Sequence, residues 1–433
     1  MSFMLHIISM NKPNCSSFMR IYLTILFSML LLAEVGAQNN NSPYSINGIG
    51  DIEDGFLNRT TGLSSTGIAY RNNRYIITNN PASLSALDDQ FFAGELGITG
   101  DYINYSGQPV SAAYSTSGDI TFKRFTFGTK LFKHWGSAVG LTPFSTENYE
   151  FSNLQALGYG GNAIPSYNEG FGGINKVYWS NAYEFFHHLS IGITSSYLFG
   201  SINSKNILQG PAGSAIYLSK NDNTFYSNFY FNYGLQYYTA LGKHWDITIG
   251  LVYANQGTLN TDHTITVLNI DSVAVRTKET VGTFNIPPDY GAGIAITHNK
   301  KYTFLADYRY QSWGQLHSNT SSYAYQNSQR ASVGFEISKK KTAFNQLFET
   351  SFLQTGLYYS QSYLIVNGKS INDMGVTVGF GVNSMRSPLS CNVILQYGVR
   401  GTTDNDLIKE GYIGASFIFS YRDFWYTKGR KFD

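Results

Sequence analysis

The sequence has little charge for its length. Asp, Glu, Lys and Arg make up 13% of its 433 residues, against roughly 25% in a typical soluble protein. The formal net charge is +2, and no block of Lys and Arg resembles a nucleic-acid footprint. A soluble domain of this size needs a charged surface, so the shortage argues against one.

Cysteine and long apolar runs are also scarce. The only cysteines are Cys15 and Cys391, and Cys15 lies in the N-terminal part that we expect to be removed as a signal peptide. A lone Cys391 in the mature chain excludes an internal disulfide framework or a cysteine-based metal cluster. Beyond residues 21–32 no apolar stretch approaches the length of about 18 residues that a membrane-spanning helix needs. We find no Gly-rich phosphate loop, acidic metal cluster or histidine in a triad context, so we expect no enzyme, no catalytic residue, no metal and no cofactor.

The N-terminus has the layout of a secretory signal peptide. Lys12 and Arg20 precede the apolar run, which is followed by small residues at Val35 and Ala37. We interpret residues 1–37 as the signal peptide, with cleavage before Gln38, rather than as a buried helix. The mature chain would then be exported into the envelope of a Gram-negative bacterium.

Aromatic residues and glycine are abundant. Aromatics reach 16%, with 33 Tyr and 30 Phe, and there are 43 Gly. A β-barrel in lipid needs an apolar outer band, aromatic girdles at both interfaces and a polar lumen. The composition fits that requirement.

Alternation of side-chain type is the decisive pattern, because successive side chains of a strand point to opposite faces. Phe304 and Tyr308 alternate with Asp307 and Arg309, and residues 391–399 and 412–421 alternate in the same way. A β-sandwich would also alternate, but with more charge on its exposed faces. We therefore predict an all-β fold for residues 90–433: a transmembrane antiparallel β-barrel of about fourteen strands with both chain ends periplasmic.

The expected connections differ in length on the two sides of the membrane. Residues 153–171, 203–223 and 257–282 would be long external loops, whereas most periplasmic turns would be short. Two stretches break this rule: the brief external hairpin at 366–369 and a longer periplasmic stretch at 339–348.

Residues 38–89 do not fit the barrel pattern. They could form a disordered periplasmic arm or a plug folded inside the lumen, and we expect the plug because the segment contains enough apolar residues to pack. Its Asn80-Pro81-Ala82 turn would anchor the plug: Pro81 fixes its own φ and biases Asn80 toward an extended conformation, while the Asn80 side chain can bond nearby backbone groups.

A series of short motifs carries a family resemblance over essentially the whole mature chain. The motifs are Ser42-Pro43-Tyr44-Ser45, Gly48-Ile49-Gly50, Asn80-Pro81-Ala82, Gly140-Leu141-Thr142-Pro143-Phe144-Ser145, Gly172-Gly173, Ser196-Tyr197-Leu198-Phe199-Gly200 and the tail 425–433. In this order and spacing the chain resembles the FadL/TodX-type outer-membrane transport proteins, as a divergent branch of that family.

The resemblance implies a fourteen-stranded barrel with an N-terminal luminal plug that acts as a gate. It also implies passive uptake of small hydrophobic molecules, fatty-acid-like or aromatic, with release sideways through a kinked wall strand. Pro143 would lie in that strand, where it cannot donate a ladder hydrogen bond. Some barrels of the wider superfamily serve instead as partners of secretion machines, so the alternative is a structural barrel subunit of a secretion or assembly complex.

Three charged residues are candidates for contact with a ligand in the lumen. Asp307, Arg309 and Arg330 take the inward face if the alternation is right. They could pair among the other luminal charges, or Arg309 or Arg330 could bind a ligand carboxylate. The expected partners are therefore outer-membrane lipids and a small hydrophobic ligand, or else a periplasmic or outer-membrane protein complex, and no nucleic acid.

Overall fold

A computed structural model describes residues 42–53, 56–107, 115–156, 163–186, 188–209, 217–269, 274–317, 323–343, 346–383 and 387–424. The predicted signal peptide, residues 1–37, and the tail from Trp425 onward lie outside these described residues. No helix within the described ranges combines the length and the apolar character needed to cross a membrane.

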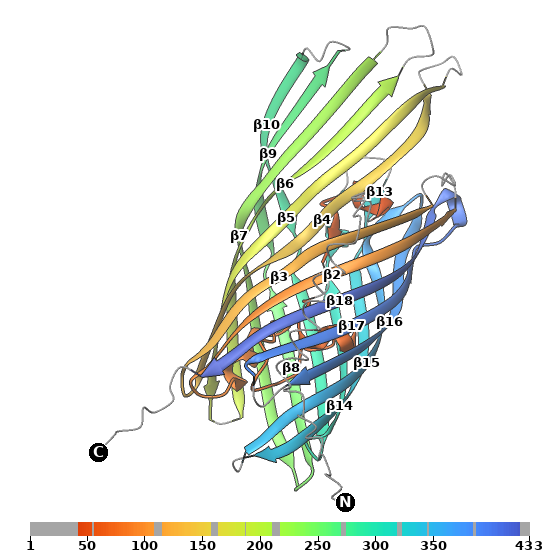
Figure 1. The fold of residues 1–433 in the computed structure, drawn as a ribbon. Helices are drawn as coiled ribbons and strands as arrows, with labels where there is room; N and C mark the ends of the chain where they lie inside the picture. Colours follow the sequence, from red (N-terminus) through yellow and green to blue (C-terminus); the bar gives the residue numbers. More distant parts are fainter. Residues whose placement is uncertain are drawn as a thin grey trace, which may run out of the picture. The chain divides into compact units, whose positions relative to one another are not determined.

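The wall consists of fourteen antiparallel strands that follow one another around a closed barrel (Figure 1). Two of the fourteen are interrupted and carry two labels each. The wall strands are β2 (Phe91–Gly107), β3 (Thr116–Phe132), β4 (Trp135–Ala156), β5 (Ala163–Phe185), β6 (Leu189–Gln209), β7 (Tyr217–Leu241), β8 (Trp245–Ala254) with β9 (Gly257–Leu268), β10 (Ala274–Ile286) with β11 (Asp289–His298), β12 (Tyr302–Gln311), β14 (Ser328–Ala343), β15 (Gln346–Val366), β16 (Lys369–Asn383), β17 (Leu389–Arg400) and β18 (Ile408–Phe424).

The barrel closes where β18 pairs with β2. Their register runs without a shift from Ile408 opposite Gly107 to Phe424 opposite Phe91. Because Phe91 begins the first wall strand and Phe424 ends the last, both strands have these ends at the same rim. The predicted all-β barrel and its fourteen strands are confirmed.

The outer face of the wall is apolar. Leu357 and Leu395 are 57% and 56% exposed, and many neighbouring strands present Val, Ile or Leu in the same way. Exposed aromatic residues lie toward both ends of the strands, such as Trp245 near one end and Tyr397 nearer the other. An apolar band between aromatic girdles is what a membrane-spanning barrel requires.

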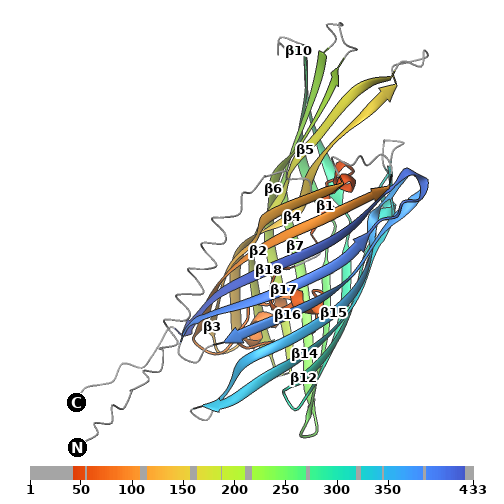
Figure 2. The same ribbon diagram turned by 45° about the vertical axis from the view of Figure 1, so that its right-hand side comes forward.

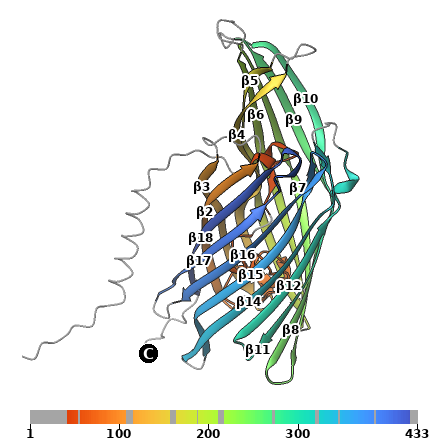
Figure 3. The same cartoon turned by 90° about the vertical axis from the view of Figure 1, so that its right-hand side faces the viewer.

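Six strands continue far beyond the rest of the barrel. The far halves of β4, β5, β6 and β7, with β9 and β10, form an extension of the wall above the other strands (Figures 1 and 3). The prediction of long loops at 153–171, 203–223 and 257–282 is therefore wrong for most of these residues. Polar residues occupy both faces of these segments, as expected where water lies on both sides, so no apolar alternation marked them as strands.

The structure also accounts for the two connections that break the expected rule of long external loops and short periplasmic turns. The stretch 339–348 is mostly strand, since β14 runs to Ala343 and β15 begins at Gln346. The hairpin between β15 and β16 is short because Asn367 and Gly368 both adopt positive φ, 49° and 74°. An Asn-Gly pair is the preferred centre of such a two-residue turn.

Candidate functional site: a luminal cavity beside a wall seam

The N-terminal segment before β2 lies against the inner face of the wall. It contains the 3₁₀ helices η1 (Pro43–Ile46), η2 (Arg59–Leu63) and η3 (Pro81–Ala86) and the short strand β1 (Asp51–Ile52). Its apolar side chains are buried together with inward-facing wall residues: Ile76 and Leu84, for example, share a cluster with Ala138 of β4. The apolar side chains of the segment therefore pack against the inner face of the wall, and the role of the segment as a plug stays a prediction.

The Asn80 turn is fixed to the main chain of the wall. The Asn80 side-chain oxygen accepts a hydrogen bond from the Ala82 amide at 3.0 Å and so caps η3. Its amide nitrogen donates to the carbonyls of Ile68, Leu235 and Leu251 at 2.9, 3.1 and 3.2 Å, the last two on β7 and β8. One side chain thus joins two parts of the plug to two wall strands.

Wall glycines make this close approach possible. A Cβ added at Gly234 would lie 2.0 Å from the Asn80 side-chain oxygen, and one at Gly192 would lie 2.4 Å from the Pro81 carbonyl carbon. Any larger residue at either position would collide with the turn. Asn80, Pro81 and Ala82 therefore lie directly against the wall where Gly192 and Gly234 leave room for them.

A second attachment, which the sequence did not reveal, is centred on Arg59. Its fully buried guanidinium donates to Glu336 of β14, with Nη2 at 2.9 Å from Oε1, and also pairs with Glu349 of β15. The Tyr70 hydroxyl donates to the same Glu336 carboxylate, and burial raises the pKa of Tyr70 well above its usual range. Buried charges of this kind are stable only when paired and hydrogen-bonded.

The first part of the N-terminal segment adds a short strand to the inner side of the wall. Strand β1 pairs with β4, with Asp51 opposite Thr146 and Ile52 opposite Ser145 (Figure 2). The Asp51 carboxylate accepts two hydrogen bonds from Arg400 of β17, at 2.7 and 2.5 Å. This bidentate geometry holds β1 in one place across the lumen.

Strand β1 occupies a seam in the wall. Strands β3 and β4 pair only between Phe125–Leu141 and Phe132–Trp135, so above Leu141 they separate. On β4 the register with β5 shifts between Pro143 and Ser145, and on β3 the register with β2 skips Lys123. The predicted wall kink at Pro143 therefore coincides with a bulge at the start of the seam.

The Lys123 bulge also brings cations inward. Lys123 pairs with Glu53, immediately after β1. The next residue, Arg124, is fully buried and donates to the carbonyls of Phe56 and Ile76 and to Glu95. The β3 side of the seam is thus attached to the N-terminal segment by Lys123 and Arg124, and the β4 side is attached through its pairing with β1.

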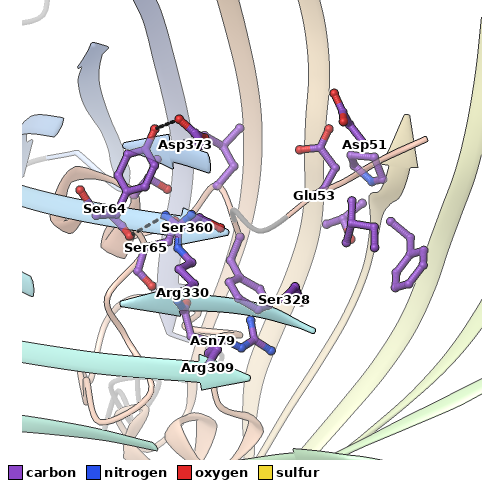
Figure 4. A pocket seen from close by; sticks show the side chains of 18 of the residues that line it. Asp51, Glu53, Ser64, Ser65, Asn79, Arg309, Ser328, Arg330, Ser360 and Asp373 are labelled. Carbon is purple, nitrogen blue, oxygen red and sulfur yellow. Dashed lines mark hydrogen bonds between the residues drawn. The ribbon is translucent and has the colours of Figure 1, made fainter. Parts of the chain in front are cut away.

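A cavity of about 460 Å³ lies beside the seam. Thr142, Pro143 and Phe144 of β4 line it, as do residues of β1, η2 and the wall opposite. Its lining is rich in charged groups from several elements (Figure 4). These are Asp51, Glu53, Asp101, Lys123, Lys176, Asp289, Arg309, Arg330, Asp373, Arg400 and Glu410.

The three candidate ligand-contact residues divide into two groups. Arg309 and Arg330 line the cavity. Asp307 has another role: one of its carboxylate oxygens accepts the amides of Gly67 and Ile68 at 2.6 and 2.9 Å, so it holds the plug. Inward-facing charge was predictable from alternation, but which charges meet the plug depends on where the plug lies.

Within the described ranges, no three or more His, Cys, Asp or Glu side chains are grouped so that they could hold a metal ion. Among the histidines that the structure describes, none lines the cavity.

Several solved structures share this fold. The toluene transporter TbuX of Ralstonia pickettii aligns over 85% of this chain and 98% of its own, with a TM-score of 0.54 and 15% identity. A FadL homologue of Pseudomonas aeruginosa aligns over 87% and 100%, with a TM-score of 0.55 and 12% identity. The toluene transporter TodX of Pseudomonas putida aligns over 86% and 99%, with a TM-score of 0.54 and 15% identity.

These likenesses confirm that the barrel has the FadL/TodX-type fold that the motifs indicated. No curated protein matches the sequence. A family model described as BamG matches residues 19–433, which is nearly the entire chain. The chain therefore belongs to the BamG family.

Proposed function

We propose that the protein is an outer-membrane barrel for the passive uptake of small hydrophobic molecules, with the N-terminal segment as its gate and the β3–β4 seam as a lateral exit. The observation that carries the proposal is the position of the seam. Above Leu141 the two strands form no ladder, and the β4 residues that begin the seam also line the cavity.

A lateral exit suits an apolar cargo. A molecule that leaves between two wall strands enters lipid directly and does not have to cross the aqueous periplasmic side. Strand β1 fills part of the seam through only two residue pairs, supported by the Asp51–Arg400 and Glu53–Lys123 ion pairs. A strand held by so few ladder bonds can leave without unfolding the barrel.

The test is a reversible disulfide between β1 and β4. Ile52→Cys and Ser145→Cys place two thiols at directly opposed positions, in a Cys391→Ser background. Uptake of radiolabelled toluene and decanoate by cells producing this variant is measured oxidised and reduced. We expect at least tenfold slower uptake of the accepted compound when oxidised, with recovery on reduction.

A matched control keeps Cys391 and adds Val382→Cys, its register partner on β16, far along the wall from the seam. Oxidising this pair should leave uptake unchanged. Equal uptake by the oxidised and reduced seam variants would rule out the lateral route.

A second candidate function is that of a structural subunit in an outer-membrane secretion or assembly complex. The extension favours it, because residues 276–283 of β10 are exposed on both faces and Val281 is 80% exposed. Native mass spectrometry of the detergent-extracted protein separates the two functions. A co-purified small lipid-like ligand supports uptake, and a stoichiometric protein partner supports the complex.

A further inference from the structure

Lys176 of β5 is the exceptional cation of the cavity. Its ammonium group lines the cavity, yet it makes no hydrogen bond or ion pair with any described residue. Three other basic side chains of the cavity have acidic partners. Lys123 pairs with Glu53, Arg400 with Asp51, and Arg309 with Asp289 at 2.6 Å. An ammonium group held away from bulk water without a counter-charge is costly.

The neighbours of Lys176 add positive charge. Lys176 Nζ lies 6.0 Å from the centre of the Phe56 ring, and the guanidinium carbon of Arg309 lies 5.5 Å from the same ring. Arg330 donates to the Ser64 carbonyl at 3.2 Å and lies over the Tyr358 ring. Figure 4 shows Arg309 and Arg330 together on one side of the cavity, with Asp51 and Glu53 on the other.

The volume and lining restrict what can occupy this space. About 460 Å³ is within the range of sites that hold small molecules, roughly 300–1,000 Å³. An occupant has to replace the hydrogen bonds of the water that it displaces from the charged groups on both sides of the cavity. A compact hydrophilic molecule can satisfy them.

We propose that the cavity is a binding site for a small hydrophilic anion, whose carboxylate or phosphate group is held by Lys176, Arg309 and Arg330. Arg309 and Arg330 offer guanidinium forks for the anion oxygens, and Lys176 supplies the point charge that lacks a partner. The Phe56 ring provides a flat apolar contact between two of these cations. The site does not depend on the lateral exit, since it needs only the cavity.

The test measures binding to the purified protein in detergent, so it does not involve the seam. Equilibrium dialysis with radiolabelled inorganic phosphate and with radiolabelled succinate separates the two anion chemistries. We expect saturable binding of at least one probe, weakened tenfold or more in Lys176→Met and retained in Lys176→Arg. Lys409→Met, an exposed lysine on β18, should bind as the unaltered protein does.

Thermal unfolding provides a second readout that does not rely on tight binding. Without probe, Lys176→Met should melt no lower than the unaltered protein, because it loses an unpaired cation. Saturating probe should raise the Tm of the unaltered protein and leave that of Lys176→Met unchanged. Absence of saturable binding of both probes, or equal binding by the unaltered protein and Lys176→Met, would overturn the assignment. If the anion binds but the oxidised seam variant still takes up cargo, only the lateral route is rejected, and the anion site stands.

Discussion

Arg59 and Glu336 are 277 residues apart in the chain and form two hydrogen bonds, from Nε to Oε2 at 3.2 Å and from Nη2 to Oε1 at 2.9 Å. The guanidinium lies 3.9 Å from the centre of the Phe352 ring and 4.3 Å from that of Tyr75. This contact joins the N-terminal segment to β14, and the Arg59 side chain is shielded from water there. Arg59 is therefore one of the buried attachments that fix the position of the N-terminal segment.

Replacing Arg59 with methionine should release the plug. The substitution leaves Glu336 buried without its cation, and removal of one partner from a buried pair costs about 3–5 kcal/mol. We expect amide hydrogens of residues 56–90 to exchange at least a hundredfold faster, while those of the wall strands keep their protection. Hydrogen exchange with mass spectrometry measures both regions in one experiment.

Arg74→Met is the matched control. Arg74 pairs with Asp88 within the same segment at 3.3 Å, but both side chains are partly exposed. Exposed pairs contribute about 0–1 kcal/mol, so exchange should change little. Equal acceleration by the two variants would mean that Arg59 has no special part in holding the plug.

Gly234→Ala should displace the anchoring turn. The new methyl group would meet the Asn80 side-chain oxygen at 2.0 Å, and overpacking of this kind costs about 1–3 kcal/mol. Protease should then cut near Asn80 in the folded barrel, as judged by heat-modifiable migration on gels. Gly411→Ala, where a Cβ meets nothing within 4 Å, should remain resistant; cutting of both variants alike would contradict the proposed fit.

The barrel could be predicted because it has a local signature. Alternation places Arg309 and Arg330 inside from their own strands alone, and Asn80-Pro81 fixes a capped turn from its own residues. Arg59 has no such signature. In a segment without periodicity, Arg-Thr-Thr-Gly indicates a solvated loop, and only the acids supplied by β14 and β15 make it a buried centre.

The full course of the seam and the extension were not predicted, for different reasons. The seam arises because bulges at Lys123 and Pro143 redirect two neighbouring strands, and a sequence shows each bulge only as a break in alternation. The extension has water on both faces, so its strands lack the apolar stripe that marks the others. Asp307 shows the same limit: its inward direction was predictable, but its bond to the Gly67 amide was not.

Cys391 tests the register of the wall. It shares the outward face of β17 with Leu395 and lies opposite Val382, which is 49% exposed. In intact cells an apolar maleimide should label it readily and a charged, water-soluble thiol reagent should label it poorly. Fast reaction with the charged reagent would show that the register of β17 is displaced by one residue.

Deletion of residues 39–75 tests whether the N-terminal segment closes the lumen. The deletion removes η1, β1 and η2 and leaves the Asn80 turn, so the wall loses the Asp51–Arg400 and Arg59–Glu336 contacts but none of its own ladders. Barrels of 16–18 strands enclose an aqueous channel, and a barrel of fourteen strands is wide enough to leak when its contents are removed.

The deleted protein should still fold, as shown by heat-modifiable migration. In planar bilayers its single-channel conductance should rise at least several-fold over that of the intact protein. It should admit small polar solutes and lose its preference for apolar ones in an uptake assay with labelled toluene. The described residues of the segment lie within the lumen. If the conductance of the deleted protein equals that of the intact protein, then either the wall narrows after the deletion or the remaining Ile76–Leu87 region closes the lumen. The gate would then have to be assigned to the Asn80 turn, with β1 acting only as a filler of the seam.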